Sequence, residues 1–498
     1  MTRGTDRPWL WSIRLCAEIL LSLGLLDLAC AQGVAGQEVA ERPCVAGAPE
    51  AKGEDQLTLV SAEPRLGLKV SGEARPFGLY YPHRQGELLV FPKASGQQLF
   101  SEGSYWETAF RDVDAQVVRV DPAVSMYVIR FSPTVELGEK IKELQERAGD
   151  RIGAVAANSC VFPQPLFARP TASDVCDQLD QWDLGAIHAR EAWSVATEMG
   201  RGVIVAIVDS GINHENPRLR DRFWSNPCFE NGVRKPNCHP LDKRPDDIHG
   251  WNFADDNSKL EDLSPSHGTM IAGIIGANGR SGVQGIAPQV ELMDLKAWRT
   301  IAETGTLANI ISGVQFAIDY QAKIINLSVA TLPSAQLEDQ IRNNPHVMFV
   351  VAAGEGQSDE RGSRLGRGPT DAVYPCVWNH PNLICVTSST EGDHADLNAN
   401  FGSQVSLAAP GVDIASTSGL SCGVKDGTSM AAPHVAGVLA LLLSHFPDDT
   451  ATKTVDRILR GEDVPELRER AKCGRVDACL ALGDGCKLKN LVPAICQR

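Results

Sequence analysis

Apolar and polar residues follow two different patterns along the chain. In the first part, short runs rich in β-branched and aromatic residues indicate strands, and one segment has the apolar spacing of a helix. The strand candidates are residues 86–92, 117–120, 126–131 and 152–157, and the helix candidate is 137–148. We therefore expect a small α+β domain that ends near residue 165.

From about residue 176, continuous apolar runs alternate with helical segments. Such runs are typical of parallel strands that are buried on both faces. The strand candidates are 203–208, 323–328, 347–353 and 383–387, and the helix candidates are 266–277, 306–320, 428–446 and 450–459. This alternation predicts an α/β fold, a doubly wound and mostly parallel sheet flanked by helices. Ligand sites in such sheets lie beyond the carboxyl ends of strands, and Asp209 and Glu355 each follow a predicted strand.

These patterns also suggest where the parts of the chain begin and end. We expect a signal peptide at 1–31, a loosely ordered segment at 32–85, the small α+β domain at 86–165, a linker at 166–180, the α/β domain at 181–482 and a cysteine-containing tail at 483–498.

The first 31 residues have the composition of a secretory signal peptide. Three arginines precede an apolar run over 15–31, and the small residues at 29–31 resemble a cleavage site. Glu18 and Asp27 interrupt the run, so a short membrane anchor, a disordered leader and a lipoprotein processing site stay open as alternatives. No later run of eighteen apolar residues is found, so we expect no membrane span after signal removal and a secreted or otherwise exported protein.

Composition and charge narrow the class of protein. The chain has 498 residues, 43% of them hydrophobic and 22% charged, which is typical of a folded globular protein. Its formal net charge is −15, and an acidic protein of this kind is a poor candidate for binding nucleic acid.

The cysteines favour disulfides. Two of the fourteen lie in the predicted signal peptide, which leaves an even number in a chain expected to be exported. Cys228 with Cys238 and Cys376 with Cys385 are near enough in sequence to pair. The tail cysteines allow three pairings; they are Cys473, Cys479, Cys486 and Cys496. Cys422 is either free or bridged, and the absence of Cys-x-x-Cys spacing argues against a zinc cluster.

Three polar residues stand where chemistry is expected. Ser429 lies in Gly-Thr-Ser-Met-Ala-Ala-Pro-His, at the start of an apolar helix, where backbone N–H groups and the helix dipole favour a developing negative charge. His267 begins another apolar helix, and Asp209 ends an apolar strand. Taken singly, each has an ordinary structural interpretation: a helix cap, a core histidine and a turn residue.

Together, these three segments resemble the subtilisin-like serine proteases, the subtilase family. Further matching segments are 285–288, 325–328, 407–411 and 474–478, so the resemblance covers about residues 176–482. The resemblance implies that Asp209 orients His267, that His267 acts as general base and then acid, and that Ser429 attacks the carbonyl. These roles are those established for subtilisin itself.

The resemblance also implies a substrate groove. An extended peptide would pair with one edge strand and face a second edge, and its side chain would enter a specificity pocket. The implied residues are Ser328, Val329 and Ala330 on the first edge, Gly305 on the second, and Ala352, Ala353 and Gly354 at the pocket. Most members have glycine where this chain has Ala330, so the side-chain preference stays open.

The position that normally stabilises the oxyanion departs from the family. Members have Ala-Ala-Gly-Asn, and this chain has Glu355 in place of the asparagine. In subtilisin, losing that donor lowers the rate by about 10²–10³. Two explanations stay open: Glu355 is protonated and donates an O–H, or it points away and a neighbour such as Gln357 supplies the donor.

The N-terminal part resembles subtilase propeptides at 87–90, 127–131 and 155–163. Such a domain would act as an intramolecular inhibitor until cleavage, which we expect between about 160 and 180. A permanent domain that is never removed is the alternative.

No cofactor is expected for the chemistry, but structural calcium is common in the family. The loop between Asn278 and Val283 stands at a frequent calcium position, although it holds Arg280 and few carboxylates. The acidic run over 255–262 is interpreted as a solvated loop and not as a second site.

The sequence thus predicts a secreted serine endopeptidase that acts on peptide or protein substrates through an acyl-enzyme. A slow or silent subtilase that binds peptides is the main alternative, favoured by Glu355. A transpeptidase with the same triad is the third.

Overall fold

The computed structural model describes most of the chain from residue 83 onward. The described residues are 83–93, 102–135, 137–163, 168–169, 176–230, 233–235, 244, 246–262, 267–280, 282–299, 305–356, 362–366, 372–483, 486, 493–494 and 496. The predicted signal peptide and almost all of the segment at 32–85 lie outside them.

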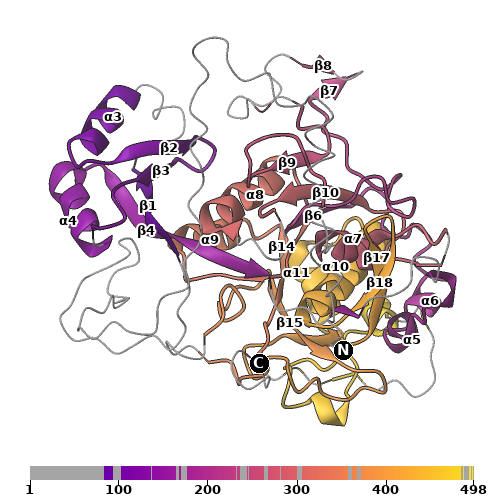
Figure 1. Cartoon of the computed structure of the whole chain (residues 1–498). Helices are drawn as coiled ribbons and strands as arrows, with labels where there is room; N and C mark the ends of the chain where they lie inside the picture. The colour runs from indigo at the N-terminus through magenta and orange to yellow at the C-terminus, as the bar shows by residue number, and fades with distance from the viewer. Residues whose placement is uncertain are drawn as a thin grey trace, which may run out of the picture. The chain divides into compact units, whose positions relative to one another are not determined.

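The small domain has a sheet of antiparallel strands covered by two helices (Figure 1). Its elements are β1 (His83–Pro92), α3 (Gly103–Arg111), β2 (Gln116–Asp121), β3 (Met126–Arg130), α4 (Leu137–Ala148) and β4 (Ile152–Pro163). Strands run in the order β4-β1-β3-β2. Helix α3 was not predicted, and the other elements were. Trp106 and Phe110 of α3 pack with Leu144 of α4 in one apolar cluster.

The sheet of the small domain is buried on both faces. Leu88 and Val90 of β1 belong to the cluster formed with α3 and α4. Leu89 and Phe91, which point the other way because side chains alternate along a strand, belong to the core of the α/β domain. The small domain therefore rests on the large one through its sheet.

The α/β domain is built on a seven-stranded parallel sheet, as predicted. The strand order is β16-β15-β14-β12-β6-β10-β9. The strands are β6 (Ile204–Asp209), β9 (Gly250–Asn252), β10 (Glu291–Lys296), β12 (Ile324–Leu327), β14 (Met348–Ala352), β15 (Leu383–Ser389) and β16 (Leu407–Pro410).

Helices cover both faces of this sheet. On one face, α7 (His267–Gly276) and α10 (Thr428–His445) share a core with Val205 and Ile207 of β6. On the other, α8 (Leu307–Asp319) and α9 (Ala335–Asn343) share a core with Ala206 and Val208. The interior strand β6 thus has apolar side chains on both faces, which explains its continuous apolar sequence.

Short elements complete the described structure. They are β5 (Ala168–Arg169), β7 (Phe229–Glu230), β8 (Val233–Arg234), β11 (Gly305–Thr306), β13 (Val329–Ala330), β17 (Ile414–Ser418), β18 (Ser421–Lys425), α5 (Trp182–Ala186), α6 (Ala189–Ala192), α11 (Ala451–Ile458), α12 (Ala478–Leu482) and the 3-10 turns Cys176–Gln178 and Pro465–Leu467. The predicted linker at 166–180 is therefore partly structured, because it contains β5 and the first of these turns.

The disulfides answer several open questions. Cys376–Cys385 is present as predicted, and the tail pairs as Cys473–Cys496 and Cys479–Cys486. Cys228 is disulfide-bonded, while its expected partner lies outside the described residues. Cys422 is bridged, to Cys176.

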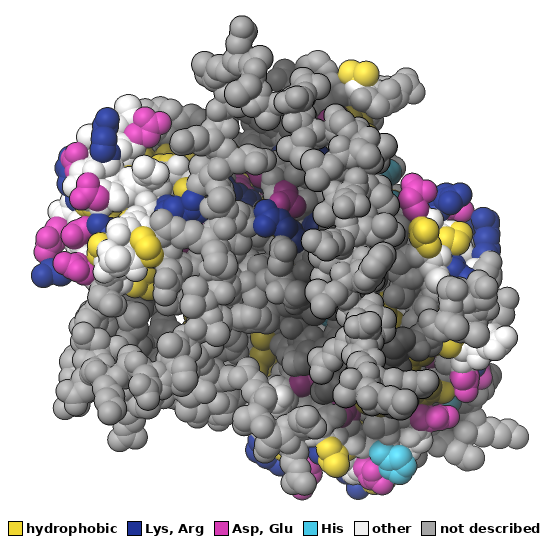
Figure 2. All heavy atoms as spheres, in the orientation of Figure 1, with side chains coloured by type: hydrophobic (Ala, Val, Ile, Leu, Met, Phe, Trp, Pro, Cys, Tyr) yellow, Lys and Arg dark blue, Asp and Glu magenta, His cyan; other side chains and the backbone are white. Residues whose placement is uncertain are grey.

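Among the described residues, α10 is long and apolar enough to cross a membrane. Because 83% of it is buried inside the protein, we assign it as the core helix of the α/β domain. The outer surface of α3 and α4 mixes acidic and basic side chains, as Figure 2 shows, and pairs such as Arg147 with Asp112 lie there.

Candidate active site

The three residues singled out by sequence come from three different elements. Asp209 is the last residue of strand β6, and His267 is the first residue of α7. Ser429 lies in the first turn of α10. All three side chains are buried.

Asp209 and His267 are in direct contact. His267 Nδ1 lies 2.7 Å from Asp209 Oδ1, and the backbone N–H of Ser210 donates to the same oxygen. Since a carboxylate accepts the bond, Nδ1 carries the proton, and in the neutral imidazole Nε2 then presents a lone pair. Nε2 has no hydrogen-bond partner among the described residues.

A glycine lets α7 approach β6 this closely. A Cβ at position 268 would lie 2.2 Å from the carbonyl oxygen of Gly211 and 3.1 Å from Asp209 Oδ1. Only glycine fits this contact, which explains the His-Gly pair at the start of the helix.

Ser429 is held by Ser328, which lies between strands β12 and β13. Its Oγ donates to the carbonyl oxygen of Ser328 at 3.3 Å, and Ser328 Oγ donates to the carbonyl oxygen of Ser429 at 3.2 Å. The structure thus joins Asp209 to His267 but does not hydrogen-bond Ser429 to His267. Catalytic hydrogen bonds are often incomplete before substrate binds.

The two predicted groove edges both pair with β4. On one side, Val329 and Ala330 of β13 lie opposite residues 163 and 162 in antiparallel register. On the other, Gly305 and Thr306 of β11 lie opposite residues 161 and 160. The end of β4 therefore runs as an extended strand between both edges.

The segment that follows β14 reaches the start of α10. Ala352 and Ala353 are fully buried, and the N–H of Gly354 donates to Thr428 Oγ1 at 3.0 Å. Glu355 Oε1 accepts both from the Thr428 N–H and from its Oγ1. Glu355 therefore faces the residue next to Ser429, and Gln357 lies outside the described residues.

Burial governs the ionisation of Glu355. Desolvation raises its pKa to about 7, opposed by the two bonds from Thr428 and reinforced by Asp396. Gly427, which precedes α10, has no side chain to cap the helix. Glu355 supplies the missing acceptor, because carboxylates stabilise the N-terminal end of a helix.

A buried group behind the Asp209–His267 pair was not predicted. Asp262 accepts from Ser210 Oγ and from both the N–H and the Oγ1 of Thr269. Burial raises its pKa to about 6. The interpretation of 255–262 as a solvated loop is therefore wrong for Asp262, which ties the segment after β6 to α7.

Lys425 is the cation near this group. Burial lowers its pKa to about 8, against the attraction of Asp262 and Asp209. It ends β18, four residues before Ser429. The sequence around Lys425 did not indicate that this side chain is buried near the site, since a lysine in a short strand is normally exposed.

The predicted calcium loop does not present suitable side chains. Asn278 Oδ1 accepts from the N–H of Arg280, and Asn278 Nδ2 donates to the carbonyl oxygen of Pro217. Arg280 itself pairs with Asp221 at 3.3 Å, and Val283 is buried. Calcium needs several oxygen ligands, so the described side chains do not fit it.

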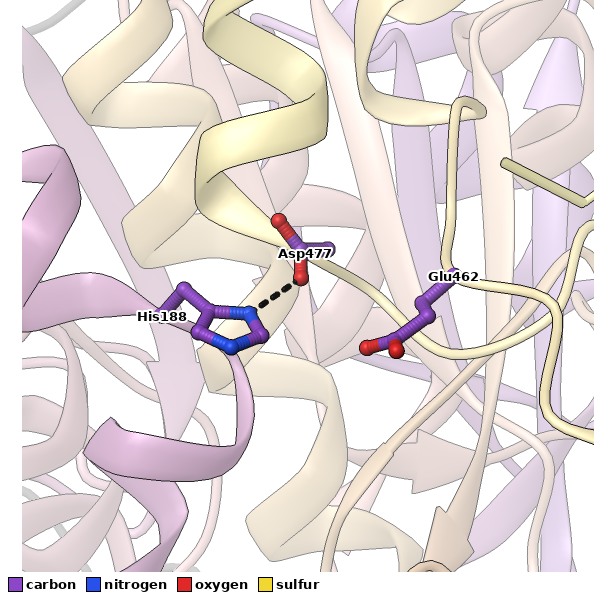
Figure 3. Close-up of side chains that lie close together, drawn as sticks. All are labelled: His188, Glu462 and Asp477. Carbon is purple, nitrogen blue, oxygen red and sulfur yellow. Dashed lines mark hydrogen bonds and ion pairs between the residues drawn. The ribbon is translucent and has the colours of Figure 1, made fainter. Parts of the chain in front are cut away.

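One other cluster has the composition of a metal site. Ligand atoms of His188, Glu462 and Asp477 lie within 4.8 Å of one another (Figure 3). His188 Nδ1 binds Asp477 Oδ2 at 2.5 Å, while Glu462 binds the guanidinium of Arg475, which also pairs with Asp393. Arg475 supplies the positive charge that a metal would bring, so we assign an ion-pair network.

Comparison with known proteins agrees with this geometry. The subtilase family of peptidase S8 matches residues 200–470. Subtilisin NAT of Bacillus subtilis subsp. natto is 31% identical over 386 residues, covering 72% of this chain and 91% of the relative. Thermitase of Thermoactinomyces vulgaris is 31% identical over 262 residues, covering 52% and 80%.

A solved structure supports the fold. Fervidolysin from Fervidobacterium pennivorans, described as a keratinolytic enzyme related to subtilisin, has a TM-score of 0.62 and 22% identity, covering 90% of this chain and 66% of that one. The chain belongs to the subtilase family. It is a subtilisin-like serine endopeptidase, and the predicted family, fold and enzyme class are confirmed.

Proposed function

We propose that the protein hydrolyses peptide bonds through an acyl-enzyme, with Ser429 as nucleophile, His267 as general base and acid, and Asp209 as the orienting carboxylate. The observation that carries this proposal is the Asp209–His267 bond at 2.7 Å, which fixes the proton on Nδ1. The tautomer leaves Nε2 as the acceptor for the serine proton.

The reaction begins with a rotation of Ser429. Its Oγ leaves the carbonyl oxygen of Ser328 and donates to His267 Nε2. As Oγ bonds to the substrate carbonyl carbon, the proton passes to Nε2 and the carbonyl oxygen becomes an oxyanion. When the C–N bond breaks, His267 gives the proton to the leaving amine, and water then releases the acyl group by the same steps.

Two groups are proposed to stabilise the oxyanion. The N–H of Ser429 lies in the first turn of α10, where backbone donors have no partner within the helix. Glu355 in its neutral form can keep the Thr428 bonds on Oε1 and donate an O–H from Oε2. Its pKa, raised to about 7 by burial, supports a neutral form below that pH.

The substrate is proposed to bind as β4 does. A peptide that replaced the end of β4 would pair with Ser328, Val329 and Ala330 on one edge and Gly305 on the other, as the registers of β4 support. Ala352, Ala353 and Gly354 would line the specificity pocket. The small domain is then an intramolecular inhibitor, since its own strand occupies this groove.

Export is proposed for this protein. Disulfides are stable in oxidising compartments, and the described residues include several. The relatives include both extracellular and intracellular proteases by name, among them a minor extracellular protease and a major intracellular serine protease of Bacillus subtilis.

A fluorophosphonate probe tests the proposal. After an added protease trims the small domain, the probe should label the protein, and Ser429→Ala should abolish the labelling. Labelling that persists in the variant would assign the nucleophile elsewhere. No labelling of the trimmed native protein would instead favour a silent subtilase that binds peptides.

A further inference from the structure

The strand that leads into Ser429 carries a second piece of the chain's own N-terminal region. β18 ends at Lys425, four residues before Ser429. β5 pairs with β18 in antiparallel register, with Ala168 opposite Lys425 and Arg169 opposite Val424. β5 follows β4 after only four residues.

β4 and β5 therefore pair with two different strands near the nucleophile. β4 ends beside β13, whose neighbour Ser328 bonds to Ser429. β5 begins beside the end of β18. A chain cut by Ser429 between these two strands would have the residues before the cut bond beside β13 and the residues after it beside β18.

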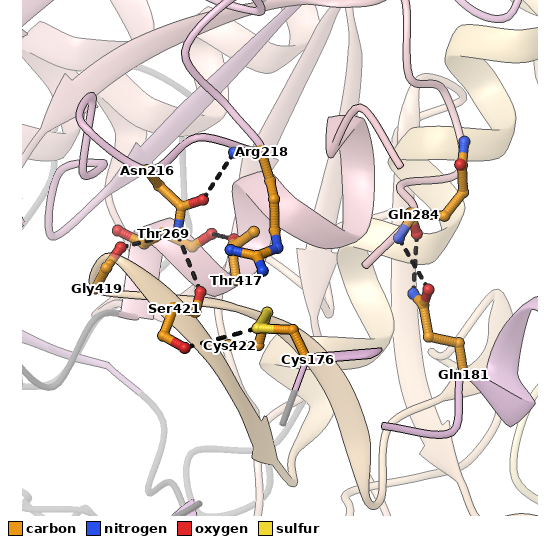
Figure 4. Close-up of a disulfide and its surroundings, with 10 residues drawn as sticks. All are labelled: Cys176, Gln181, Asn216, Arg218, Thr269, Gln284, Thr417, Gly419, Ser421 and Cys422. Atoms are coloured by element: carbon orange, nitrogen blue, oxygen red, sulfur yellow. Dashed lines mark hydrogen bonds between the residues drawn. A yellow bond between two sulfur atoms is a disulfide. The ribbon is translucent and has the colours of Figure 1, made fainter. Parts of the chain in front are cut away.

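A disulfide fixes β5 to the strand with which it pairs. Cys176 lies seven residues after Arg169, and it is bonded to Cys422 of β18 (Figure 4). Six residues separate β5 from this anchor. The seven residue steps from Arg169 to Cys176 span at most about 25 Å, so β5 stays close to β18 at an effective concentration of about 1 mM or more.

The anchor itself is fixed to the catalytic framework. Asn216 Nδ2 donates to the carbonyl oxygens of Gly419 and Ser421, at the turn and start of β18. Thr417 Oγ1 of the partner strand β17 donates to the carbonyl oxygen of Thr269, in the helix that begins with His267. The disulfide thus joins Cys176 to a hairpin that is bound to α7.

We propose that the Cys176–Cys422 tether keeps β5 on β18 after the chain is cut upstream of β5, so that β5 competes with the substrate residues that follow the cut bond. This rests on the proposed peptidase function. The processed enzyme then retains a short internal competitor. Its activity toward peptides with several residues after the cut bond is lowered, because those residues compete with β5. Its activity toward substrates with a small leaving group is unaffected.

The first residue of the processed protein is the first test. We expect it to lie before Ala168, with the disulfide intact under non-reducing mass spectrometry. A first residue after Arg169, or a chain that is never cut, would overturn the proposal because β5 would not be a retained tethered segment.

The second test releases β5 without touching the disulfide. Residues 170–175 are replaced by the recognition sequence of an unrelated sequence-specific protease, and kcat/KM is measured before and after that protease acts. Release should raise kcat/KM about fivefold or more for an internally quenched peptide with several residues on both sides of the cut bond. A chromogenic peptide that ends in a small leaving group should change less than about twofold.

Disulfide variants give an independent measurement. Cys176→Ser with Cys422→Ser should favour the two-sided peptide in the same way, and the matched control, Cys376→Ser with Cys385→Ser, should not. Equal changes with both peptides, or no change on release, would overturn the tether. Absence of both activity and probe labelling would instead be a failure of the proposed function.

Discussion

Replacing Glu355 by glutamine separates the two forms of this side chain. The amide keeps an acceptor oxygen for Thr428 and a donor group, but it is neutral at every pH. In the native enzyme only protonated Glu355 donates, and burial places its pKa at about 7, with Asp396 also raising it. In the proposed role of Glu355, deprotonation above that pH removes a donor and adds a negative charge near the oxyanion.

The size of the effect follows from this titration. One pH unit above its pKa, about a tenth of a carboxyl group is protonated, so at about pH 8 the Glu355→Gln variant should exceed the native enzyme about tenfold. At about pH 6 the two should agree within about twofold. The measurement is kcat/KM for one chromogenic peptide from about pH 5.5 to about pH 9.

A second substitution tests whether the titration of Glu355 causes the loss of activity at high pH. Asp396→Asn removes the charge that raises the Glu355 pKa, so the alkaline loss of activity should begin at lower pH. If native enzyme and Glu355→Gln lose activity in parallel at high pH, Glu355 is not a titrating donor. A variant that is slower at every pH would show that the carboxylate has a positive role.

Three further predictions concern the framework. Asp209→Asn should lower kcat by about 10⁴ with little change in KM, because the amide favours the wrong His267 tautomer; a loss below tenfold would contradict the assigned role. Gly268→Ala should reduce the free energy of unfolding, measured by urea titration, by about 1–3 kcal/mol, since its Cβ would lie 2.2 Å from the carbonyl oxygen of Gly211. The control Gly138→Ala, whose Cβ would meet no atom within 4 Å, should be neutral or stabilising in the same titration. His188→Gln should cost more stability at about pH 5.5 than at about pH 8.5, because the bond to Asp477 raises the pKa of His188. The stabilisation is fully present below the ordinary pKa of 6.5 and is lost as the pH rises through the raised pKa. A loss of stability that is the same at both pH values, measured in a Ser429→Ala background, would refute this prediction.

Local patterns were sufficient for most of the fold. β6, α7 and α10 differ from their predicted bounds by a residue or so, because each is a long apolar run with glycine or proline nearby. α3 was missed, since Glu102 before it makes no capping bond. Its Trp106, Ala109 and Phe110 do have helical spacing, and that was the signal available.

The family resemblance predicted the contact between Asp209 and His267, but other contacts between distant residues were not predictable from the sequence. Asp262 looked like one more acid in a polar loop, and only the folded chain brings it to Ser210 and Thr269. The bond between Glu355 and Thr428 joins residues 73 apart. Cys176 and Cys422 are 246 residues apart, and no local spacing distinguishes that pair from others.

The disulfides at both ends of the α/β domain affect how well such a protease resists digestion by other copies of itself. Proteases attack chains that fray, and termini fray first. Cys176–Cys422 fastens the region where the domain begins, and Cys473–Cys496 with Cys479–Cys486 fastens the region where it ends. Self-digestion must then wait for an opening within the domain, so the working lifetime of the enzyme is set by the slow unfolding of its core.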